Sequence, residues 1–480
     1  MPTRCVDAVQ LTEQLARIAD GPAGPQVGAF FDLDGTLVAG YTASTFFTDR
    51  LRHREVSLGT ASRTIARALD GAYFGGEPTA GAVGGYGALR GQTEDRLVDL
   101  GERLFAQQIA RTIRPQARAL VHAHKQAGHT VVVASAASHF QIDPVAADLG
   151  IEHVVCTELE AVDGVLTGEI RGKLLWGPQK AAGVRAFAKS HLVDLRASYA
   201  YGNGDEDVAF LAAVGNPVAL NAATGLRQAA GRFGWPVLDL ENPADSGPVE
   251  LGRTLLALGG LNAGAATGMA WGLLRRDRQA GLSLGVAMAK ESLGLAGVSI
   301  RVTGEERLPD GPAVYVANHQ SSLDPVVAAA VIPGEFTIIA KKEARFDPRS
   351  VAASLLVDPA YIDRSDSAQA RATLDALVER IHGGTSLLIF PEGTRSATPT
   401  LGRFRKGGFH VAIQAQVPIV PLVLRNTGEI LPRHGRVLRP GVVDVAVLDP
   451  VENLRAEDLD GEVAALWDRF TAALNDWPGA

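Results

Sequence analysis

The sequence predicts an α/β protein with a doubly wound first domain, a helical cap on that domain, and a second α/β domain preceded by a hydrophobic two-helix element. In both halves, short apolar runs typical of buried strands alternate with helical stretches, which indicates sheets covered by helices. A segment rich in proline and acidic residues, 238–249, separates the halves as a linker. The length of 480 residues, with 46% apolar and 21% charged residues, suits a globular chain with two or three cores.

Composition and charge exclude several classes of protein. The net charge of −7 argues against a surface that binds nucleic acid, so an anionic ligand requires a local cluster of cations. Two cysteines, Cys5 and Cys156, cannot form a disulfide framework, which suits a reducing compartment. The stretch MPTRCVDAVQLTEQLARIAD carries charges throughout and has no apolar core, so we expect no secretory signal there.

The first domain is expected at residues 25–245. Residues 27–38, VGAFFDLDGTLV, predict a buried strand that runs into a glycine turn. Residues 42–113 are mostly helical, with Thr93 as a cap and leucines at helical spacing, and predict the helical cap after this strand. The segments HTVVVASAAS and LRASYAYGNGDEDVAF predict two more strands that end in loops, as in a doubly wound sheet.

Between the domains, residues 246–298 predict a linker and a membrane-associating helical hairpin. The stretch 254–274 contains no charge, and as a helix it would be about 31 Å long, close to the hydrocarbon thickness of a bilayer. Its five glycines, asparagine and two threonines suit a buried or surface-lying helix nearly as well, so spanning and surface attachment both remain open. A second stretch, 282–297, contains a lysine and a glutamate and is expected to lie on the surface. Three arginines between the two stretches suit a cytoplasmic end: Arg275, Arg276 and Arg278.

The first candidate site begins where the segment FFDLDGTL ends its strand. Asp32 and Asp34 can flank one spot across the turn at Gly35, where two carboxylates can hold Mg²⁺ and leave one free as a nucleophile. A capped turn is the plainer explanation of this pair alone. Other groups at strand ends or helix starts support an anion site: Ser135, Lys180 after Pro178, Asn203, Asp205 and Asp207.

Four pieces in this order resemble the haloacid dehalogenase superfamily, in particular its phosphoserine-phosphatase-like branch with a helical cap. They are the segment FFDLDGTL, the strand with Ser135, the helix start with Lys180 and the segment YGNGDEDVAF. The resemblance implies that Asp32 is the nucleophile that forms an aspartyl-phosphate and that Asp34 is the general acid and base. It implies further that Ser135 and Lys180 hold the phosphoryl group. The Mg²⁺ ligands implied by the resemblance are Asp32, Asp34, Asn203 and Asp207.

Two positions depart from the pattern of this superfamily. Asn203 stands where a metal-binding aspartate is usual, so one negative charge is lost and Mg²⁺ affinity should fall, with Asp205 as a candidate to compensate. Tyr41 stands where phosphoserine phosphatases carry a glutamate, and a phenol cannot balance the substrate ammonium. A phosphatase fold is therefore expected without phosphoserine as the implied substrate. A phosphoserine phosphatase and a degenerate binding or regulatory module remain as alternatives.

The second candidate site lies in NHQSSLDP, residues 318–325. On an unbroken helix His319 and Asp324 would point about 140° apart. However, His319 ends the strand VYVANH, and Asp324 stands at a helix start with Pro325 in the first turn, so Asp324 can hold one imidazole nitrogen and leave the other as a base. An anionic substrate that presents a hydroxyl is suggested by further groups in YIDRSD and FPEGTRS: Arg364, Glu392, Gly393, Thr394 and Arg395.

The segments NHQSSLD, YIDR, FPEGTRS and VPIVPL match in order and spacing the four blocks of the glycerolipid acyltransferases, most closely the 1-acyl-sn-glycerol-3-phosphate acyltransferases. The resemblance covers about residues 299–450 of a domain expected at 299–480. It implies that His319, oriented by Asp324, deprotonates a glycerol hydroxyl that attacks an acyl thioester, with no acyl-enzyme. Arg364 and the loop with Glu392, Gly393, Thr394 and Arg395 would bind the phosphate. Asp358 replaces the glycine that usually begins the second block.

Together these features predict a bifunctional enzyme of phospholipid biosynthesis. The second domain would convert lysophosphatidic acid to phosphatidic acid with acyl-CoA or acyl-carrier protein as the donor, and the first would be a Mg²⁺-dependent phosphatase. Membrane phospholipids are the expected partners, and no nucleic acid is expected. Abundant arginine, alanine and glycine suggest a GC-rich bacterium, so we expect the cytoplasmic face of a bacterial cell membrane. The acyl-chain length, the phosphatase substrate and the oligomeric state stay open.

Overall fold

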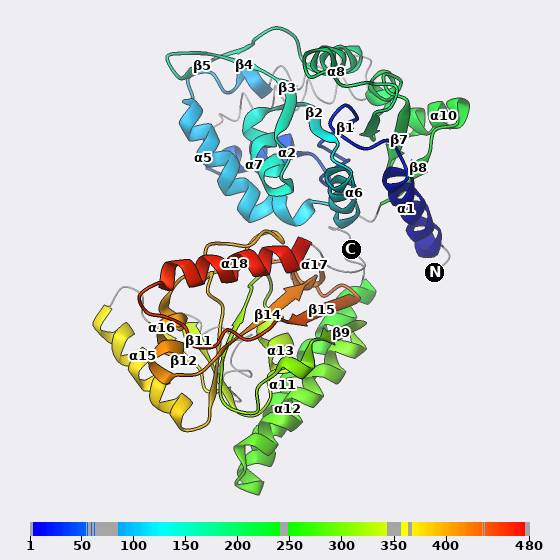
Figure 1. Cartoon of the computed structure of the whole chain (residues 1–480). Helices are drawn as coiled ribbons and strands as arrows, with labels where there is room; N and C mark the ends of the chain where they lie inside the picture. The colour runs from blue at the N-terminus through cyan, green and yellow to red at the C-terminus, as the bar shows by residue number, and fades with distance from the viewer. Residues whose placement is uncertain are drawn as a thin grey trace. The chain divides into compact units, whose positions relative to one another are not determined.

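The computed structural model divides the chain into two compact units, Met1–Asp245 and Ser246–Ala480, which are described separately (Figure 1). The described residues are 3–53, 85–240, 248–342, 357–362, 367–433 and 437–475, together with the single residues 55, 59, 62 and 435.

The first unit is built on a six-stranded parallel sheet in the order β3-β2-β1-β6-β7-β8. The apolar strand β1 is fully buried and central, since β2 and β6 pair with it on its two edges. The strands are β1 (Gly28–Phe31), β2 (Thr130–Ser138), β3 (His153–Thr157), β6 (Tyr199–Gly202), β7 (Asn216–Leu220) and β8 (Val237–Leu238).

Helices cover both faces of this sheet. Successive residues of β1 point to opposite faces, so Phe31 and Phe30 belong to different cores. Side chains of α1, α6 and α7 join the core that contains Phe31, whereas those of α8, α9 and α10 join the core that contains Phe30. The predicted doubly wound architecture is therefore confirmed. The helices are α1 (Thr3–Ala19), α6 (Pro115–Gln126), α7 (His139–Leu149), α8 (Pro178–Ser190), α9 (Val208–Leu211) and α10 (Thr224–Phe233).

The helical cap predicted at about residues 42–113 is described only in part, because most of residues 54–84 lie outside the described residues. Thr93 caps α5 by accepting a hydrogen bond from the Arg96 N–H, as the sequence predicts. The predicted apolar face of α5 is buried through Leu97, Leu100 and Leu104. A two-stranded antiparallel sheet, β4-β5, follows β3. These elements are α2 (Thr42–Arg52), α5 (Glu94–Leu104), the π-turn η1 (Phe105–Ile109), the 3₁₀ turn η2 (Ala110–Thr112), β4 (Leu159–Val162) and β5 (Val165–Ile170).

The second unit is built on a seven-stranded sheet in the order β12-β11-β13-β10-β14-β15-β9. Every neighbouring pair is parallel except β14 and β15, which are antiparallel. The strand β10 is again central and fully buried, with β13 and β14 on its two edges. The strands are β9 (Val298–Thr303), β10 (Val314–Ala317), β11 (Phe336–Lys341), β12 (Ala360–Ile362), β13 (Ser386–Ile389), β14 (Ile419–Arg425) and β15 (Gly441–Val447).

The second sheet also has a separate core on each face. Tyr315 of β10 packs in a core with α12 and α13, whereas its neighbours Val314 and Val316 pack in a core with α15, α16 and α18. This arrangement confirms the second predicted α/β domain. Its helices are α13 (Asp324–Ala329), α15 (Ser367–His382), α16 (Gly407–Ala415), α17 (Thr427–Ile430) and α18 (Leu459–Asn475), with a 3₁₀ turn, η4 (Glu305–Arg307).

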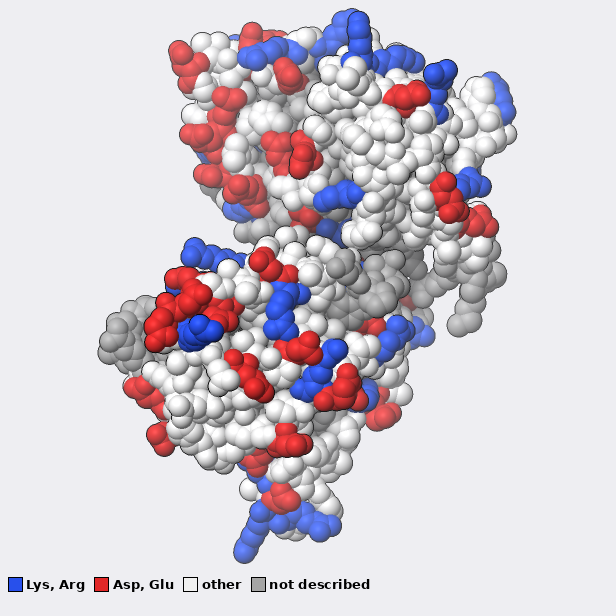
Figure 2. Space-filling model, viewed as in Figure 1, with Lys and Arg blue, Asp and Glu red and all other residues white. Residues whose placement is uncertain are grey.

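The hydrophobic element forms an antiparallel helical hairpin of α11 (Pro248–Arg275) and α12 (Arg278–Leu295). Glycines allow the two helices to touch through their backbones: a Cβ added at Gly268 would lie 2.5 Å from the Gly281 carbonyl oxygen. Large apolar side chains of α11 are exposed instead, including Leu255, Leu273 and Leu274. Figure 2 shows basic side chains gathered where the hairpin turns, the position of the three arginines. Within the part of the chain that the structure describes, no helix combines the length and apolar character needed to cross a bilayer.

A chain of hydrogen bonds with a single direction crosses the core of the first unit. The Pro22 carbonyl can only accept, so His129 donates to it from Nε2 at 2.8 Å and must accept at Nδ1. His124 therefore donates to His129 from Nδ1 at 2.8 Å and accepts the Tyr201 hydroxyl at Nε2, also at 2.8 Å. Gln14 completes the chain by donating to the Tyr201 oxygen. Two neutral histidines satisfy every link in this direction, and burial favours the neutral rings because it lowers the pKa of both.

We expect Gly268→Ala to lower the free energy of unfolding by about 1–3 kcal/mol, because its new Cβ would force the hairpin helices apart. Gly259→Ala is the matched control, since its Cβ would meet nothing within 4 Å. That control should raise stability by up to about 1 kcal/mol through helix propensity. Thermal unfolding of both variants measures the difference, and equal shifts in the two variants would contradict the close packing.

The buried histidines should make the first unit sensitive to acid. Burial lowers the pKa of His124 from 6.5 to about 3 and also lowers that of His129. Between pH 6.5 and these lowered values, the unfolded chain binds protons that the folded chain does not, so stability falls as the pH falls. The slope is about 1.4 kcal/mol per pH unit for each histidine. In urea unfolding, His124→Phe should be less stable at neutral pH and should show a shallower acid dependence than the parent. Identical slopes would show that His124 is not a neutral buried group.

Candidate active sites

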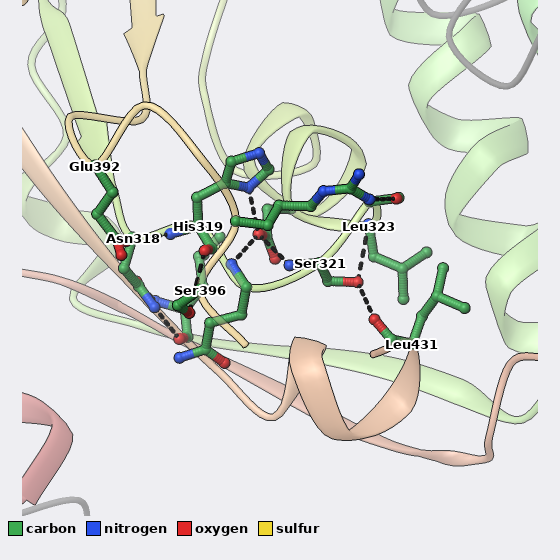
Figure 3. Close-up of polar contacts among 12 residues, drawn as sticks. Asn318, His319, Ser321, Leu323, Glu392, Ser396 and Leu431 are labelled. Carbon is green, nitrogen blue, oxygen red and sulfur yellow. Dashed lines mark hydrogen bonds and ion pairs between the residues drawn. The ribbon is translucent and has the colours of Figure 1, made fainter. Parts of the chain in front are cut away.

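The second site lies at the carboxyl end of β10. Asn318 is the first residue after this strand, and its side-chain amide binds the neighbouring strand in both directions. It donates to the Leu424 carbonyl at 2.8 Å and accepts the Leu424 N–H at 2.7 Å. The reciprocal pair satisfies a buried amide and fixes the loop that follows (Figure 3). His319, the next residue, is therefore placed by a rigid element.

The structure brings His319 and Asp324 together. The imidazole Nδ1 lies 2.7 Å from Asp324 Oδ2, and the same oxygen accepts the main-chain N–H groups of Gln320 and Ser321 at 2.7 Å each. Asp324 is fully buried as the first residue of α13, and the His319 side chain is 19% exposed. Because a carboxylate accepts at Nδ1, that nitrogen carries the proton and Nε2 keeps a free lone pair. The geometry is that of an oriented general base.

Phe390 stacks on the imidazole of His319, a contact that the sequence does not predict. The two rings stack with centroids 4.2 Å apart and an interplanar angle of 22°. Phe390 directly follows β13, the strand that pairs with β10, so the parallel register of the two strands brings the rings together. The signal was available in FPEGTRS, where an aromatic residue immediately follows a buried strand.

The side chain of Glu392 is directed toward the main chain of the protein and not toward solvent. Its Oε1 accepts the His319 N–H at 2.7 Å and its Oε2 accepts the Gly402 N–H at 2.9 Å. Burial raises the pKa of Glu392 to about 7, against these two hydrogen bonds, which favour the ionised form. The sequence predicted a substrate-binding residue here, whereas both oxygens contact main chain.

The remaining loop residues lie close to the segment that carries His319. Gly393 adopts a positive φ of 70°, and Thr394 is exposed beside it. Arg395 donates to the Ser322 hydroxyl, three residues beyond the base. Arg433, which the sequence reasoning missed, donates to the Thr394 hydroxyl at 3.5 Å from the loop after α17. These positions suit an anionic ligand.

The second block is described only in part. Arg364 lies outside the described residues, so its predicted phosphate contact stays a prediction. Asp358, which replaces the usual glycine, has φ at 45° and thus adopts the left-handed conformation that glycine favours. The substitution therefore leaves the turn in a glycine-like backbone conformation.

In the first unit, a buried lysine joins two of the predicted carboxylates. Lys180, in the first turn of α8, donates to Asp32 Oδ1 at 2.8 Å and to Asp207 Oδ1 at 2.7 Å. Asp32 directly follows β1, and Asp207 ends the turn η3 (Asp205–Asp207). These two carboxylates raise the pKa of Lys180 against the cost of its burial, so the lysine stays charged. The sheet edge therefore carries a fixed cation beside the candidate nucleophile.

Burial disfavours the ionised form of the carboxylates at this site, which outnumber the one lysine beside them. It raises the pKa of Asp32 to about 7, although Lys180 opposes the shift. It raises the pKa of Asp34 to about 6, opposed by the Thr42 N–H and hydroxyl, which donate to Asp34 at 2.7 and 3.2 Å. The buried carboxylates of Asp32 and Asp207 and the half-buried one of Asp34 thus lie near a single ammonium, and a hard divalent cation would balance the excess negative charge.

The metal set predicted from the sequence stays a prediction. Both oxygens of Asp207 accept hydrogen bonds, Oδ1 from Lys180 and Oδ2 from the N–H groups of Asn203 and Gly204. Asp205 Oδ1 accepts the Leu226 N–H in the first turn of α10. No group of three His, Cys, Asp or Glu residues in the described ranges could hold a metal ion. Asp32, Asp34 and the Asn203 amide oxygen, which accepts the Thr36 hydroxyl at 3.1 Å, would supply oxygen donors that fit Mg²⁺ with reduced charge.

Two other predicted positions lie near this edge. Ser135 is buried within β2, where its hydroxyl accepts the Ala137 N–H at 3.3 Å. Tyr41 precedes α2 and is 68% exposed, so its ring is open to solvent instead of holding a buried substrate group.

Comparison with known proteins places each unit. The family model of haloacid dehalogenase-like hydrolases matches residues 29–212, and the acyltransferase family model matches residues 299–425. A 1-acyl-sn-glycerol-3-phosphate acyltransferase of Saccharomyces cerevisiae is 38% identical over 176 residues, 35% of this chain and 57% of that protein. A putative hydrolase of Mycobacterium leprae is 32% identical over 263 residues, 54% of this chain and 85% of that protein. The crystal structure of the acyltransferase PlsC from Thermotoga maritima aligns at 23% identity and a TM-score of 0.39, covering 48% of this chain and all of that one.

Fold, sites and relatives define a chain that joins a hydrolase-type domain to an acyltransferase-type domain. Through its first unit it belongs to the haloacid dehalogenase-like hydrolases. Its second unit matches the acyltransferase family model over residues 299–425. The chain spans 57% of the yeast acyltransferase and 63% of the ovine one, so the activity of those whole proteins is not carried over as a finding.

If the first site holds Mg²⁺ through the Asn203 amide, millimolar Mg²⁺ should raise the unfolding temperature of the first unit. At a concentration of 100 Kd the stabilisation is about 2.7 kcal/mol. Asn203→Asp restores the lost charge and should tighten Mg²⁺ binding, measured by calorimetry and by thermal shift. Asp205→Asn is the control, because Asp205 caps α10 and should leave the Mg²⁺ response unchanged. A parent and an Asn203→Asp variant that both ignore Mg²⁺ would rule out the cation site.

Proposed function

We propose that the second domain transfers an acyl group from an acyl thioester to the sn-2 hydroxyl of a 1-acyl-glycerol-3-phosphate and so forms phosphatidic acid. The observation that carries this proposal is the buried Asp324 carboxylate on His319 Nδ1, which leaves Nε2 free at the end of β10. The second support is the Thr394 and Arg395 loop beside it, which is suited to an anionic group. The acyltransferase relatives agree with this assignment.

In this mechanism His319 Nε2 takes the proton of the hydroxyl as its oxygen attacks the thioester carbonyl carbon. Asp324 stabilises the imidazolium that forms. Collapse of the tetrahedral intermediate breaks the carbon–sulfur bond, and the imidazolium returns its proton to the leaving thiolate. Each turnover therefore forms one ester and one thiol, and the chain supplies no covalent nucleophile. The donor is acyl-CoA or acyl-carrier protein.

We expect the phosphate of the acceptor to be bound by the arginines on and near the loop 393–402. Arg395, Arg433 and, from the sequence, Arg364 would bind it with charge-assisted hydrogen bonds. Binding there would hold the glycerol hydroxyl near His319, because Arg395 reaches Ser322 in the same loop as the base.

We assign the hairpin of α11 and α12 to the membrane surface. Its exposed leucines would enter the boundary of the hydrocarbon region, and the arginines at its turn would face lipid phosphates. The cytoplasmic face of a bacterial cell membrane is the proposed location, where both the lipid acceptor and the thioester donor are available.

For the first domain we propose a phosphomonoester hydrolase. The supporting observation is Lys180, which is buried between Asp32 and Asp207 and is placed to hold a phosphoryl group against the Asp32 carboxylate. Asp32 would attack phosphorus while Asp34 protonates the leaving oxygen and later deprotonates the water that releases phosphate. Mg²⁺ held by Asp32, Asp34 and Asn203 would supply charge neutralisation. Exposed Tyr41 favours a substrate without an ammonium group over phosphoserine.

The two activities should be lost separately. His319→Ala should reduce acyl transfer to lysophosphatidic acid by roughly 10²- to 10⁴-fold, because it removes the general base, and should leave aryl phosphate hydrolysis intact. Asp32→Asn should do the converse. Lipid analysis of the products and phosphate release, with and without Mg²⁺, measure both reactions on the same preparations.

Three results would refute parts of this assignment. A folded His319→Ala protein that keeps its acyl transfer rate would refute the first proposal. Phosphate release unaffected by Asp32→Asn would refute the second. If the parent hydrolyses no phosphate ester, the first domain is a binding or regulatory module attached to the acyltransferase.

A further inference from the structure

The carboxylate of Glu392 is committed to two main-chain donors from different segments. One oxygen accepts the N–H of His319 and the other accepts the N–H of Gly402, at 2.7 and 2.9 Å. Figure 3 shows Glu392 approaching the His319 segment from the strand side. The residue is 6% exposed, so little of it remains open to a ligand.

Gly402 is required by this contact. A Cβ at position 402 would lie 2.7 Å from Glu392 Oε2, closer than real contacts of a Cβ. The carbonyl of the same glycine accepts the Trp467 Nε1–H of α18 at 3.0 Å. The N–H and the C=O of Gly402 are therefore both hydrogen-bonded. These bonds hold the carboxyl end of the loop 393–402 against Glu392.

The loop is also bonded to the other main-chain group of the base. The Ser396 N–H donates to the His319 carbonyl at 2.7 Å, and the Gln320 amide donates to the Pro399 carbonyl at 3.4 Å. The N–H and the C=O of His319 thus both bind the segment 392–396. Any displacement of Glu392 moves the base and the loop that carries Arg395 together.

We propose that Glu392 is a positioning residue that holds the main chain of His319 against the loop 393–402 and does not touch the acceptor. The proposal rests on the acyltransferase function proposed above. A misplacement of about 1 Å at a reacting group can lower a rate by roughly 100-fold, so this contact controls turnover without contributing to substrate affinity.

The first test is Glu392→Gln, which keeps the shape of the side chain. The amide can accept only one of the two N–H groups and turns a donor toward the other, so one charge-assisted bond becomes a repulsive contact. We expect kcat for lysophosphatidic acid to fall roughly 10- to 150-fold, with the KM for the acceptor within about threefold of the parent. A KM increased more than tenfold at unchanged kcat would show that Glu392 binds the acceptor and would overturn the proposal.

The second test moves Glu392 without changing it. Gly402→Ala should displace the carboxylate and reproduce the loss of kcat, and adding it to Glu392→Gln should cost little more. Gly407→Ala is the matched control, since a Cβ there would meet nothing within 4 Å. An inert Gly402→Ala, or fully additive losses in the double variant, would overturn the proposal.

The third measurement does not depend on turnover. Hydrogen exchange of the full chain should show faster exchange of the His319 N–H region in Glu392→Gln and Gly402→Ala than in the parent and in Gly407→Ala. Unchanged exchange in both variants would overturn the positioning role. If both variants exchange faster than the parent but the parent transfers no acyl group to any acceptor, the contact exists and the proposed function is wrong.

Discussion

The main-chain groups of His319 are the constraint on which the second site depends. The N–H is held by Glu392 and the C=O by Ser396, while the ring is held by Asp324 and stacked on Phe390. Each contact comes from a segment that follows or precedes a buried parallel strand. Because strands β10 and β13 are neighbours in one register, the candidate base and the loop 393–402 are held in one fixed arrangement. The position of His319 relative to this loop is therefore set before any ligand binds.

The same topological rule places both sites of the chain. In each unit the central strand, β1 or β10, has parallel neighbours on both edges and ends at a candidate catalytic residue. Carboxyl ends of parallel strands converge with helix starts, so acids, bases and main-chain donors meet there without long loops. The electrostatics differ between the two. The first site concentrates carboxylates around one buried lysine, whereas the second isolates a single carboxylate behind an imidazole and leaves cations at the entrance.

The parts that the sequence predicts are those encoded locally. The strand ends at Asp32 and His319, the Thr93 cap and the alternation of strands and helices follow from patterns within about 15 residues, and the structure contains them. The roles of Glu392, Asp205 and Asp207 do not follow in this way, because each is decided by a main-chain or lysine partner up to 73 positions distant. The chain of His124, His129 and Tyr201 is hidden for the same reason. The histidines, one on α6 and one just before β2, suggest nothing until Tyr201, which is 77 residues after His124, supplies the hydroxyl. A local pattern identifies a polar residue at an edge, but only the tertiary partner shows whether that residue faces a ligand or the protein.

In a hairpin of two amphipathic helices, large apolar side chains are usually needed both to pack the helices together and to form an apolar outer surface. The glycines between α11 and α12 remove the first of these needs. The contact between these helices is made by backbone atoms at Gly268, Gly281 and their neighbours, so no bulky residue is needed to hold them together. Large side chains such as Leu255 and Leu274 are left entirely on the outside. The outer surface can consequently change during evolution, in chain bulk, aromatic content or charge, without loosening the hairpin. Substitutions on this outer surface can therefore change what the hairpin contacts without disturbing the backbone packing that joins α11 to α12.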